Sequence, residues 1–252
     1  MNKTFTLFSI IILSGITCFS QEEQMKPSET EVWEPVPEVV TPGIGTEAPS
    51  DAIILFGGND DFDKNWIVPD ISNWYVKDNV LCINAQDDQL ENIKMLESKQ
   101  SFGDIQLHVE WKAPTEIKRD GQRRGNSGIF LMGKYEIQVL DNYENRTYSN
   151  GQAASVYKQT IPLVNACRKP GEWQTYDIIF TAPRFDIGGN VESPAYVTVI
   201  HNGVLVQNHT EIRGPIKFRG YPRYEPHAEK LPLRLQDHGD AVNFRNIWVR
   251  EL

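Results

Sequence analysis

Residues 105–111 read IQLHVEW, an unbroken alternation of apolar and polar side chains. Successive side chains of a β-strand point to opposite faces, so this alternation predicts a strand with one buried face. The same pattern returns at residues 135–139 (YEIQV) and 233–236 (LRLQ). We therefore expect a fold built from half-buried strands.

The chain after residue 50 adds further β-rich segments and few helical ones. Asn202-Gly203 divides the run AYVTVIHNGVLVQN (195–208) and predicts a hairpin, because a type I′ turn needs positive φ at both positions. About ten short strands without alternating helices predict an all-β fold, a two-sheet antiparallel sandwich or barrel with a jelly roll as the leading arrangement. The other expected strands are 53–56, 73–76, 80–84, 128–132, 174–180 and 243–250.

Residues 1–20 (MNKTFTLFSIIILSGITCFS) have the layout of a secretory signal peptide: a positive start at Lys3, an apolar run, and small residues at Cys18 and Ser20. They predict an exported protein that is periplasmic, secreted or held at the cell surface. A membrane anchor is the alternative, but the apolar run is shorter than the roughly 20 residues that span a bilayer. Lipid attachment at Cys18 is a second alternative, which the residues before it match poorly. We expect no transmembrane segment in the mature chain.

Residues 21–50 contain seven Glu, one Lys and five Pro, a composition that favours an extended acidic linker. A docking arm with apolar anchors at Val32-Trp33 and Val39-Val40 is the alternative. The linker holds much of the acidity of a chain whose 34 acidic and 25 basic residues give a net charge of −9. Residues 51–252, the expected jelly-roll domain, have 27 acidic and 23 basic residues and a net charge of −4. This charge argues against a nucleic-acid partner, which needs a clustered cationic face.

Three of the predicted strands carry reactive side chains on their polar faces. If these strands are neighbours in one sheet, the side chains form one charged patch; an ordinary solvated sheet face is the alternative. Such a patch would offer acid and base groups for catalysis. It would also offer nitrogen and oxygen ligands for a divalent metal ion, with His108, Glu110, Glu136 and His238 as candidates. The residues on these faces are His108, Glu110, Glu136, Gln138, Arg234, Gln236 and His238.

Motifs of several other enzyme classes are absent from the sequence. It contains no Gly-x-Ser-x-Gly, His-Glu-x-x-His or Cys-x-x-Cys motif. The Gly-rich basic stretch 119–128 lacks the Gly-Lys-Ser/Thr ending of a phosphate loop. Without residues 1–20 the chain keeps Cys82 and Cys167, which we expect to be separate thiols rather than a disulfide.

Several motifs in order along residues 53–252 resemble the 3-keto-disaccharide hydrolase domain family. They are GNSGIF (125–130), YEIQVLD (135–141), GEWQTYD (171–177), HNGV (201–204), LQDHG (235–239) and FRNI (244–247). The resemblance implies a concanavalin A-like jelly roll of two curved antiparallel sheets whose concave face holds sugar. It also implies activity on glycosides whose C3 hydroxyl has been oxidised to a ketone.

The resemblance and the strand pattern together give a set of expected site residues. A 3-keto group acidifies the proton on C2, so a base can remove it, the C1 oxygen can leave by elimination, and water can then add. The expected acid and base groups are Glu136, Glu110 and His238, and the expected substrate-binding residues are Gln138, Asp141, Asn126, Arg234, Gln236, His108 and Tyr157. A divalent metal ion that chelates the ketone is a candidate cofactor, and no organic cofactor is expected.

Three alternatives to this activity remain open at this point. An ordinary glycosidase would use Glu110 and Glu136 as a carboxylate pair that flanks the bond. A carbohydrate-binding module would place aromatic platforms at the cleft, with Trp66, Trp74, Tyr143, Tyr148 and Tyr157 as candidates. A structural envelope protein is the third alternative. The linkage, the leaving group and the oligomeric state are left open.

Overall fold

A computed structural model describes residues 25–70, 72–85 and 93–252, and the predicted signal peptide lies outside them. The chain divides into two units, residues 1–39 and a compact unit from Val40 to Leu252. The described part of the first unit is a stretch of exposed residues with one short turn of helix, η1 (Pro27–Glu29). No helix in the described ranges is long and apolar enough to cross a membrane.

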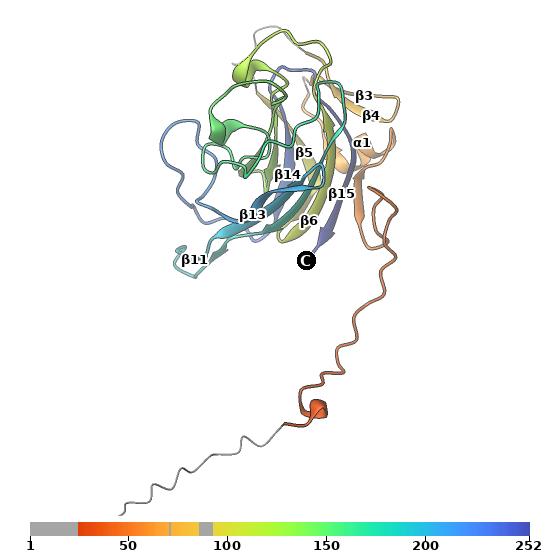
Figure 1. Cartoon of the computed structure of the whole chain (residues 1–252), viewed down its shortest axis with the longest axis vertical. Helices are drawn as coiled ribbons and strands as arrows, with labels where there is room; N and C mark the ends of the chain where they lie inside the picture. Colours follow the sequence, from red (N-terminus) through yellow and green to blue (C-terminus); the bar gives the residue numbers. More distant parts are fainter. Residues whose placement is uncertain (1–24, 71, 86–92) are drawn as a thin grey trace, which may run out of the picture. The chain divides into compact units, whose positions relative to one another are not determined.

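The compact unit contains two antiparallel sheets, as the strand pattern predicts (Figure 1). The large sheet has the spatial order β13 (Val204–Ile212), β12 (Ala195–His201), β9 (Gln174–Thr181), β6 (Ile105–Lys112), β15 (Asn243–Glu251), β4 (Val80–Ile83) and β3 (Trp74–Lys77), and β1 (Ile53–Phe56) also pairs with β15. The small sheet has the order β2 (Trp66–Ile67), β5 (Lys94–Phe102), β14 (Leu231–Asp237), β7 (Ser127–Leu131) and β8 (Tyr135–Val139). The all-β sandwich is therefore confirmed.

In the described part of the compact unit, helical structure is confined to short connections. They are α1 (Asp61–Asn65), η2 (Gly121–Arg123) and η3 (Ser149–Gly151). A separate two-stranded ribbon pairs β10 (Arg184–Phe185) with β11 (Val191–Ser193). The predicted hairpin at Asn202-Gly203 joins β12 to β13, and both residues have positive φ.

The space between the two sheets is filled by the apolar residues of the alternating strands. Leu107 and Val109 of β6 and Ile137 and Val139 of β8 are fully buried members of one continuous core. Since neighbouring residues of a strand point to opposite sides, the polar residues between them must lie on the outer faces of the sandwich. Burying these four side chains contributes about 2 kcal/mol each.

A loop extends the small sheet beyond the edge strand β8. Val156 forms an antiparallel bridge with Ile137, and the Tyr157 amide donates a 3.2 Å hydrogen bond to the Glu136 carbonyl oxygen. Two residues that flank this bridge, Ala154 and Lys158, have positive φ (65° and 58°). The loop thus lies along the edge of β8 beside Glu136.

Candidate active site

The predicted polar faces do not form one patch, because their strands belong to different sheets. Strand β6 lies between β9 and β15 in the large sheet, whereas β8 and β14 belong to the small sheet. His108 and Glu110 therefore point away from the sandwich on one side, and Glu136 and Gln138 on the other. Strand alternation predicted the outward direction correctly. The condition for a single patch, that all three strands share one sheet, is met by β8 and β14 but not by β6.

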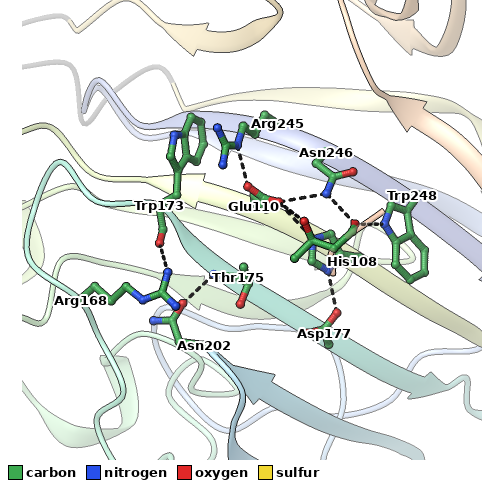
Figure 2. Close-up of polar contacts among 11 residues, drawn as sticks. His108, Glu110, Arg168, Trp173, Thr175, Asp177, Asn202, Arg245, Asn246 and Trp248 are labelled. Atoms are coloured by element: carbon green, nitrogen blue, oxygen red, sulfur yellow. Dashed lines mark hydrogen bonds and ion pairs between the residues drawn. The ribbon is translucent and has the colours of Figure 1, made fainter. Parts of the chain in front are cut away.

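On the large sheet, Glu110 is the centre of a closed hydrogen-bonding cluster (Figure 2). Its carboxylate accepts hydrogen bonds from Arg245 Nε (2.6 Å), Asn246 Nδ2 (3.0 Å) and Thr46 Oγ1 (2.9 Å). Burial alone would favour the neutral acid, but the nearby His108 ring and these three hydrogen-bond donors hold the pKa of Glu110 far below its ordinary value. A carboxylate with so many donors is a poor base, and we assign it a structural role.

His108 belongs to the same cluster and has its own carboxylate partner. Its Nδ1 lies 2.6 Å from Asp177 Oδ1, its Nε2 lies 3.7 Å from Glu110, and its ring stacks on Trp248 (Figure 2). Burial opposes the charged imidazolium, but the hydrogen bond to Asp177 and the nearby Glu110 carboxylate raise the pKa of His108. The Thr46 carbonyl oxygen accepts bonds from Asn246 and Trp248, so the cluster fastens the segment around Thr46 to the sheet.

On the small sheet, Glu136 is buried in a different way. The residue is 3% exposed, and no described residue donates a hydrogen bond to its carboxyl group. Burial raises the pKa of Glu136 to about 8. Its register partner on β7 is Phe130, and a Cβ atom added to Gly128 would lie only 2.5 Å from Glu136 Oε1. The absence of a side chain at Gly128 therefore makes room for the carboxyl group.

Amide side chains continue this face of the small sheet beside Glu136. Gln138 Nε2 donates a 3.1 Å bond to Asn126 Oδ1, and Asn126 Nδ2 donates a 2.7 Å bond to the Gln122 carbonyl oxygen. Gln236 lies two residues beyond Arg234 on β14, and its buried Oε1 has no partner among the residues that the structure describes. The face thus combines one buried carboxyl group with amides, which is a suitable lining for a sugar hydroxyl array.

Tyr157 lies beside β8, and His238 follows the strand that carries Gln236. Tyr157 is half-buried opposite Glu136, and its Oη lies 2.6 Å from the Oη of Tyr148. His238 follows directly after β14, and burial lowers its pKa. At neutral pH a histidine of this kind is uncharged, so it can accept a proton or a hydrogen bond.

Two predicted substrate-binding residues have partners elsewhere. Asp141 is buried and accepts a 2.6 Å bond from Arg124 Nε, so it anchors the loop and does not line the face. Arg234 is paired with Glu97 of β5 at 2.6 Å, and its guanidinium packs over Gly133 at the turn between β7 and β8. Both side chains are therefore held in ion pairs with other residues of the protein.

The candidate metal ligands are not gathered in one place. His108 and Glu110 lie on the outer face of the large sheet, and Glu136 lies on that of the small sheet. Within residues 25–70, 72–85 and 93–252 no three His, Cys, Asp or Glu side chains converge on a common point. These residues do not fit a metal centre, so we derive no step through a metal ion.

The structure adds features that the sequence reasoning missed. Gly128 belongs to a family motif, but its role in making room for Glu136 was not predicted. Tyr148 was expected only as an aromatic platform, and its contact with Tyr157 was not predicted. Trp66 and Trp74, two other platform candidates, are buried in the core. A cavity of about 190 Å³ also lies beyond Asn126, with Arg119, Arg123 and Asp240 among its lining residues.

Comparisons with known proteins place the chain in a family. The model of the 3-keto-alpha-glucoside-1,2-lyase-like domain matches residues 51–250. A 3-keto-disaccharide hydrolase of Bacteroides thetaiotaomicron is 27% identical over 186 residues, which are 60% of this chain and 59% of that protein, so the match spans less than two thirds of the relative.

Solved structures agree with this placement. A candidate glycosyl hydrolase of Parabacteroides distasonis is 47% identical, with a TM-score of 0.82 over 90% of this chain and 97% of the other. A second one from that organism is 20% identical, with a TM-score of 0.56 over 80% of this chain and 94% of the other, and shows the fold alone. Because the family match takes in residues 51–250, the chain belongs to the family of 3-keto-alpha-glucoside-1,2-lyase-like domains.

Proposed function

We propose that this protein is a carbohydrate-active enzyme that cleaves the glycosidic bond of 3-keto-glycosides, with Glu136 as the base. The observation that carries the proposal is the buried Glu136 carboxyl group, which lacks a donor among the described residues and has a pKa of about 8. A general base works best when its pKa lies near the working pH. The family description and the name of the Bacteroides relative supply the substrate class.

The chemistry begins at C2 of the sugar. The Glu136 carboxylate takes the C2 proton, and the electron pair of the C–H bond forms an enolate with the C3 ketone. The enolate then collapses, the C1–O bond breaks, and the leaving oxygen departs with a proton. Addition of water across the new C1–C2 double bond, by the reverse order of steps, completes the hydrolysis.

The amides around Glu136 suit the recognition of a sugar ring. Gln138 and Gln236 lie on the same face, and Asn126 is bonded to Gln138. Amide groups both donate and accept hydrogen bonds, as sugar hydroxyls do. In a site with little water, a donor aimed at the enolate oxygen stabilises the transition state more than the substrate.

An ordinary glycosidase mechanism is disfavoured by the placement of the two carboxylates. A pair that flanks a glycosidic bond lies about 5–10 Å apart. Glu110 and Glu136 point outward from opposite sheets, and packed sheets are themselves about 10 Å apart. The substrate therefore needs another source of activation, which the 3-keto group supplies.

Export of the protein is a further proposal, and the dependence of the reaction on a divalent metal ion is tested separately. Export rests on the signal-peptide layout of residues 1–20 alone. A metal requirement is tested by adding a chelator to the assay. Activity that survives the chelator supports the action of Glu136 without a metal.

The test compares a 3-keto-glucoside with the corresponding intact glucoside. We expect the purified protein to release the alcohol from the keto sugar only, and Glu136→Gln to abolish this release. Glu110→Gln is the matched control, because it makes the same chemical change on the other sheet and should keep the activity. Cleavage of the intact glucoside, or full activity of Glu136→Gln, would refute the proposal; binding of sugar without any turnover would favour a binding module.

A further inference from the structure

Two tyrosine hydroxyl groups lie in direct contact beside the proposed base. Tyr148 Oη and Tyr157 Oη are 2.6 Å apart, so one donates a hydrogen bond to the other. Tyr157 is half-buried, whereas Tyr148 is 40% exposed. The pair therefore leads from the buried side of the site to its rim.

Sheet register places this pair next to Glu136. The Val156–Ile137 bridge is antiparallel, and the Tyr157 amide bonds to the Glu136 carbonyl oxygen, so Tyr157 stands opposite Glu136. Residues directly opposite in an antiparallel pair point to the same face, with their Cβ atoms about 5 Å apart. Burial raises the pKa of both tyrosines, and the charge of the Glu136 carboxylate raises it further. Both phenols are therefore protonated at neutral pH and can act as donors.

The backbone is arranged to hold the two rings in place. A Cβ atom on Gly151 would lie 2.0 Å from Tyr148 Cε2, so only glycine leaves room for the ring there. Ala154 and Lys158, on either side of Tyr157, both adopt the left-handed conformation that residues with a side chain avoid. Such strain, at a cost of about 1–3 kcal/mol for each residue, is concentrated at functional sites.

We propose that the Tyr148–Tyr157 pair carries a proton from the Glu136 carboxyl group to the departing glycosidic oxygen. This inference rests on the proposed function of Glu136. When the C1–O bond breaks, its electron pair stays on the leaving oxygen, which takes the Tyr148 proton. Tyr148 takes a proton from Tyr157. No described residue donates a hydrogen bond directly to the Glu136 carboxyl group, so Tyr157 recovers its proton from that group through one water molecule. The Glu136 carboxyl group had gained this proton from C2. The leaving group departs as an alcohol, and all three side chains return to their starting protonation states.

The order of the groups suits this direction of transfer. A free phenol has a pKa of about 10, so a phenolate takes a proton from a carboxyl group of pKa about 8 in a favourable step. The buried Glu136 is close to the sugar carbon that loses its proton, and the exposed Tyr148 is where a leaving group can depart into water. In the hydration step the same chain runs in reverse and removes a proton from the attacking water.

The test uses two 3-keto-glucosides that differ in their leaving groups. Methanol needs a proton in order to leave, whereas 4-nitrophenol leaves readily as an anion. Tyr148→Phe, which keeps the ring over Gly151, should lower kcat/KM about 100-fold or more for the methyl glucoside and less than about 10-fold for the nitrophenyl glucoside. Tyr157→Phe should show the same dependence on the leaving group. Tyr196→Phe is the control, because this tyrosine stacks on His209 in the large sheet and should change neither rate.

Exchange of the C2 hydrogen with deuterium from heavy water separates this inference from the proposed function. Tyr148→Phe should still catalyse the exchange, because Glu136 is intact, and Glu136→Gln should not. If kcat/KM fell equally for both leaving groups, or if C2 exchange were lost together with cleavage, the tyrosines would only position the loop. If the wild-type protein neither exchanges C2 hydrogen nor cleaves either substrate, the proposed function fails and this inference falls with it.

Discussion

Replacing Glu136 by glutamine should stabilise the folded protein, by an amount that grows with pH. The carboxyl group is 3% exposed, and its pKa rises from 4.5 to about 8 on folding. The folded chain therefore holds a proton that the unfolded chain releases between these two pH values. Hence the stability contributed by this residue is fully present below pH 4.5 and is lost as the pH rises towards about 8. Glutamine has nearly the same shape and no charge, so it removes this penalty.

The size of the effect follows from the same pKa. Each pH unit between the unfolded and folded values corresponds to about 1.4 kcal/mol. Relative to the wild-type protein, the free energy of unfolding of the glutamine variant should be higher by less than about 1 kcal/mol at about pH 5, by about 3 kcal/mol at about pH 7 and by about 5 kcal/mol above about pH 8. An unsatisfied amide would shift all three values equally, so the change with pH is the decisive quantity.

Urea unfolding of both proteins at these three pH values measures the effect. The m-value should be the same for both, because the surface exposed on unfolding does not change. A free energy difference that stays constant from about pH 5 to about pH 9 would show that the carboxyl group is ionised at its ordinary pKa. That result would refute the description of Glu136 as a buried base with a raised pKa.

Three further predictions concern the two carboxylates and the space around them. Glu110→Gln should destabilise the fold by about 2 kcal/mol at neutral pH, since it weakens the hydrogen bonds to Arg245 and Thr46. This loss of stability should shrink below about pH 4, because a carboxylate with a lowered pKa stabilises the fold only above the pKa it has in the unfolded chain. Urea unfolding measures the loss, and kcat/KM should stay unchanged. Gly128→Ala should displace the Glu136 carboxyl group, which lies 2.5 Å from the new Cβ, and lower kcat/KM about 100-fold; a normal rate would contradict the geometry. The kcat/KM of the wild-type protein for a 3-keto-glucoside should rise about tenfold per pH unit up to about pH 8 and then level off, whereas a plateau from about pH 5 would exclude Glu136 as the titrating base.

Strand alternation predicted which side chains leave the core. Glu136, Gln138 and Gln236 point outward as expected, because the residues between them are buried without exception. Alternation says nothing about which sheet a strand joins. Strand β6 pairs with β9 and β15, which lie far from it in sequence, and this non-local pairing carried Glu110 to the opposite side of the sandwich.

Strand β5 shows why an entire element escaped prediction. Its sequence, KMLESKQSF, lacks clear alternation, and Ser98 lies buried where an apolar residue is expected. The Ser98 hydroxyl donates to the Gln100 carbonyl oxygen and accepts a 2.9 Å bond from the Leu233 amide. A polar residue that is satisfied in this way is tolerated in a core, but only the folded structure supplies its partners.

The candidate site was predicted in part for similar reasons. The family motifs pointed to Glu136, Gln138 and Gln236, and these residues share one face of the small sheet. Asp141 lies in the same motif, but its carboxylate is bonded to Arg124, which no spacing rule indicates. The space that the absent side chain of Gly128 leaves for Glu136 depends on strand register, and the contact between the two tyrosines depends on loop geometry. Neither could be derived from the sequence.

Exchange at C2 of a 3-keto-glucoside tests the central claim most directly. The protein is incubated with the keto sugar in heavy water, and proton NMR follows the C2 signal together with the release of the alcohol. With the wild-type protein, deuterium should enter at C2 and the alcohol should be released. Glu136→Gln should do neither, whereas Glu110→Gln should do both at the wild-type rate. Unchanged exchange and cleavage by Glu136→Gln, or their loss in Glu110→Gln with the fold intact, would contradict the assignment of Glu136 as the base.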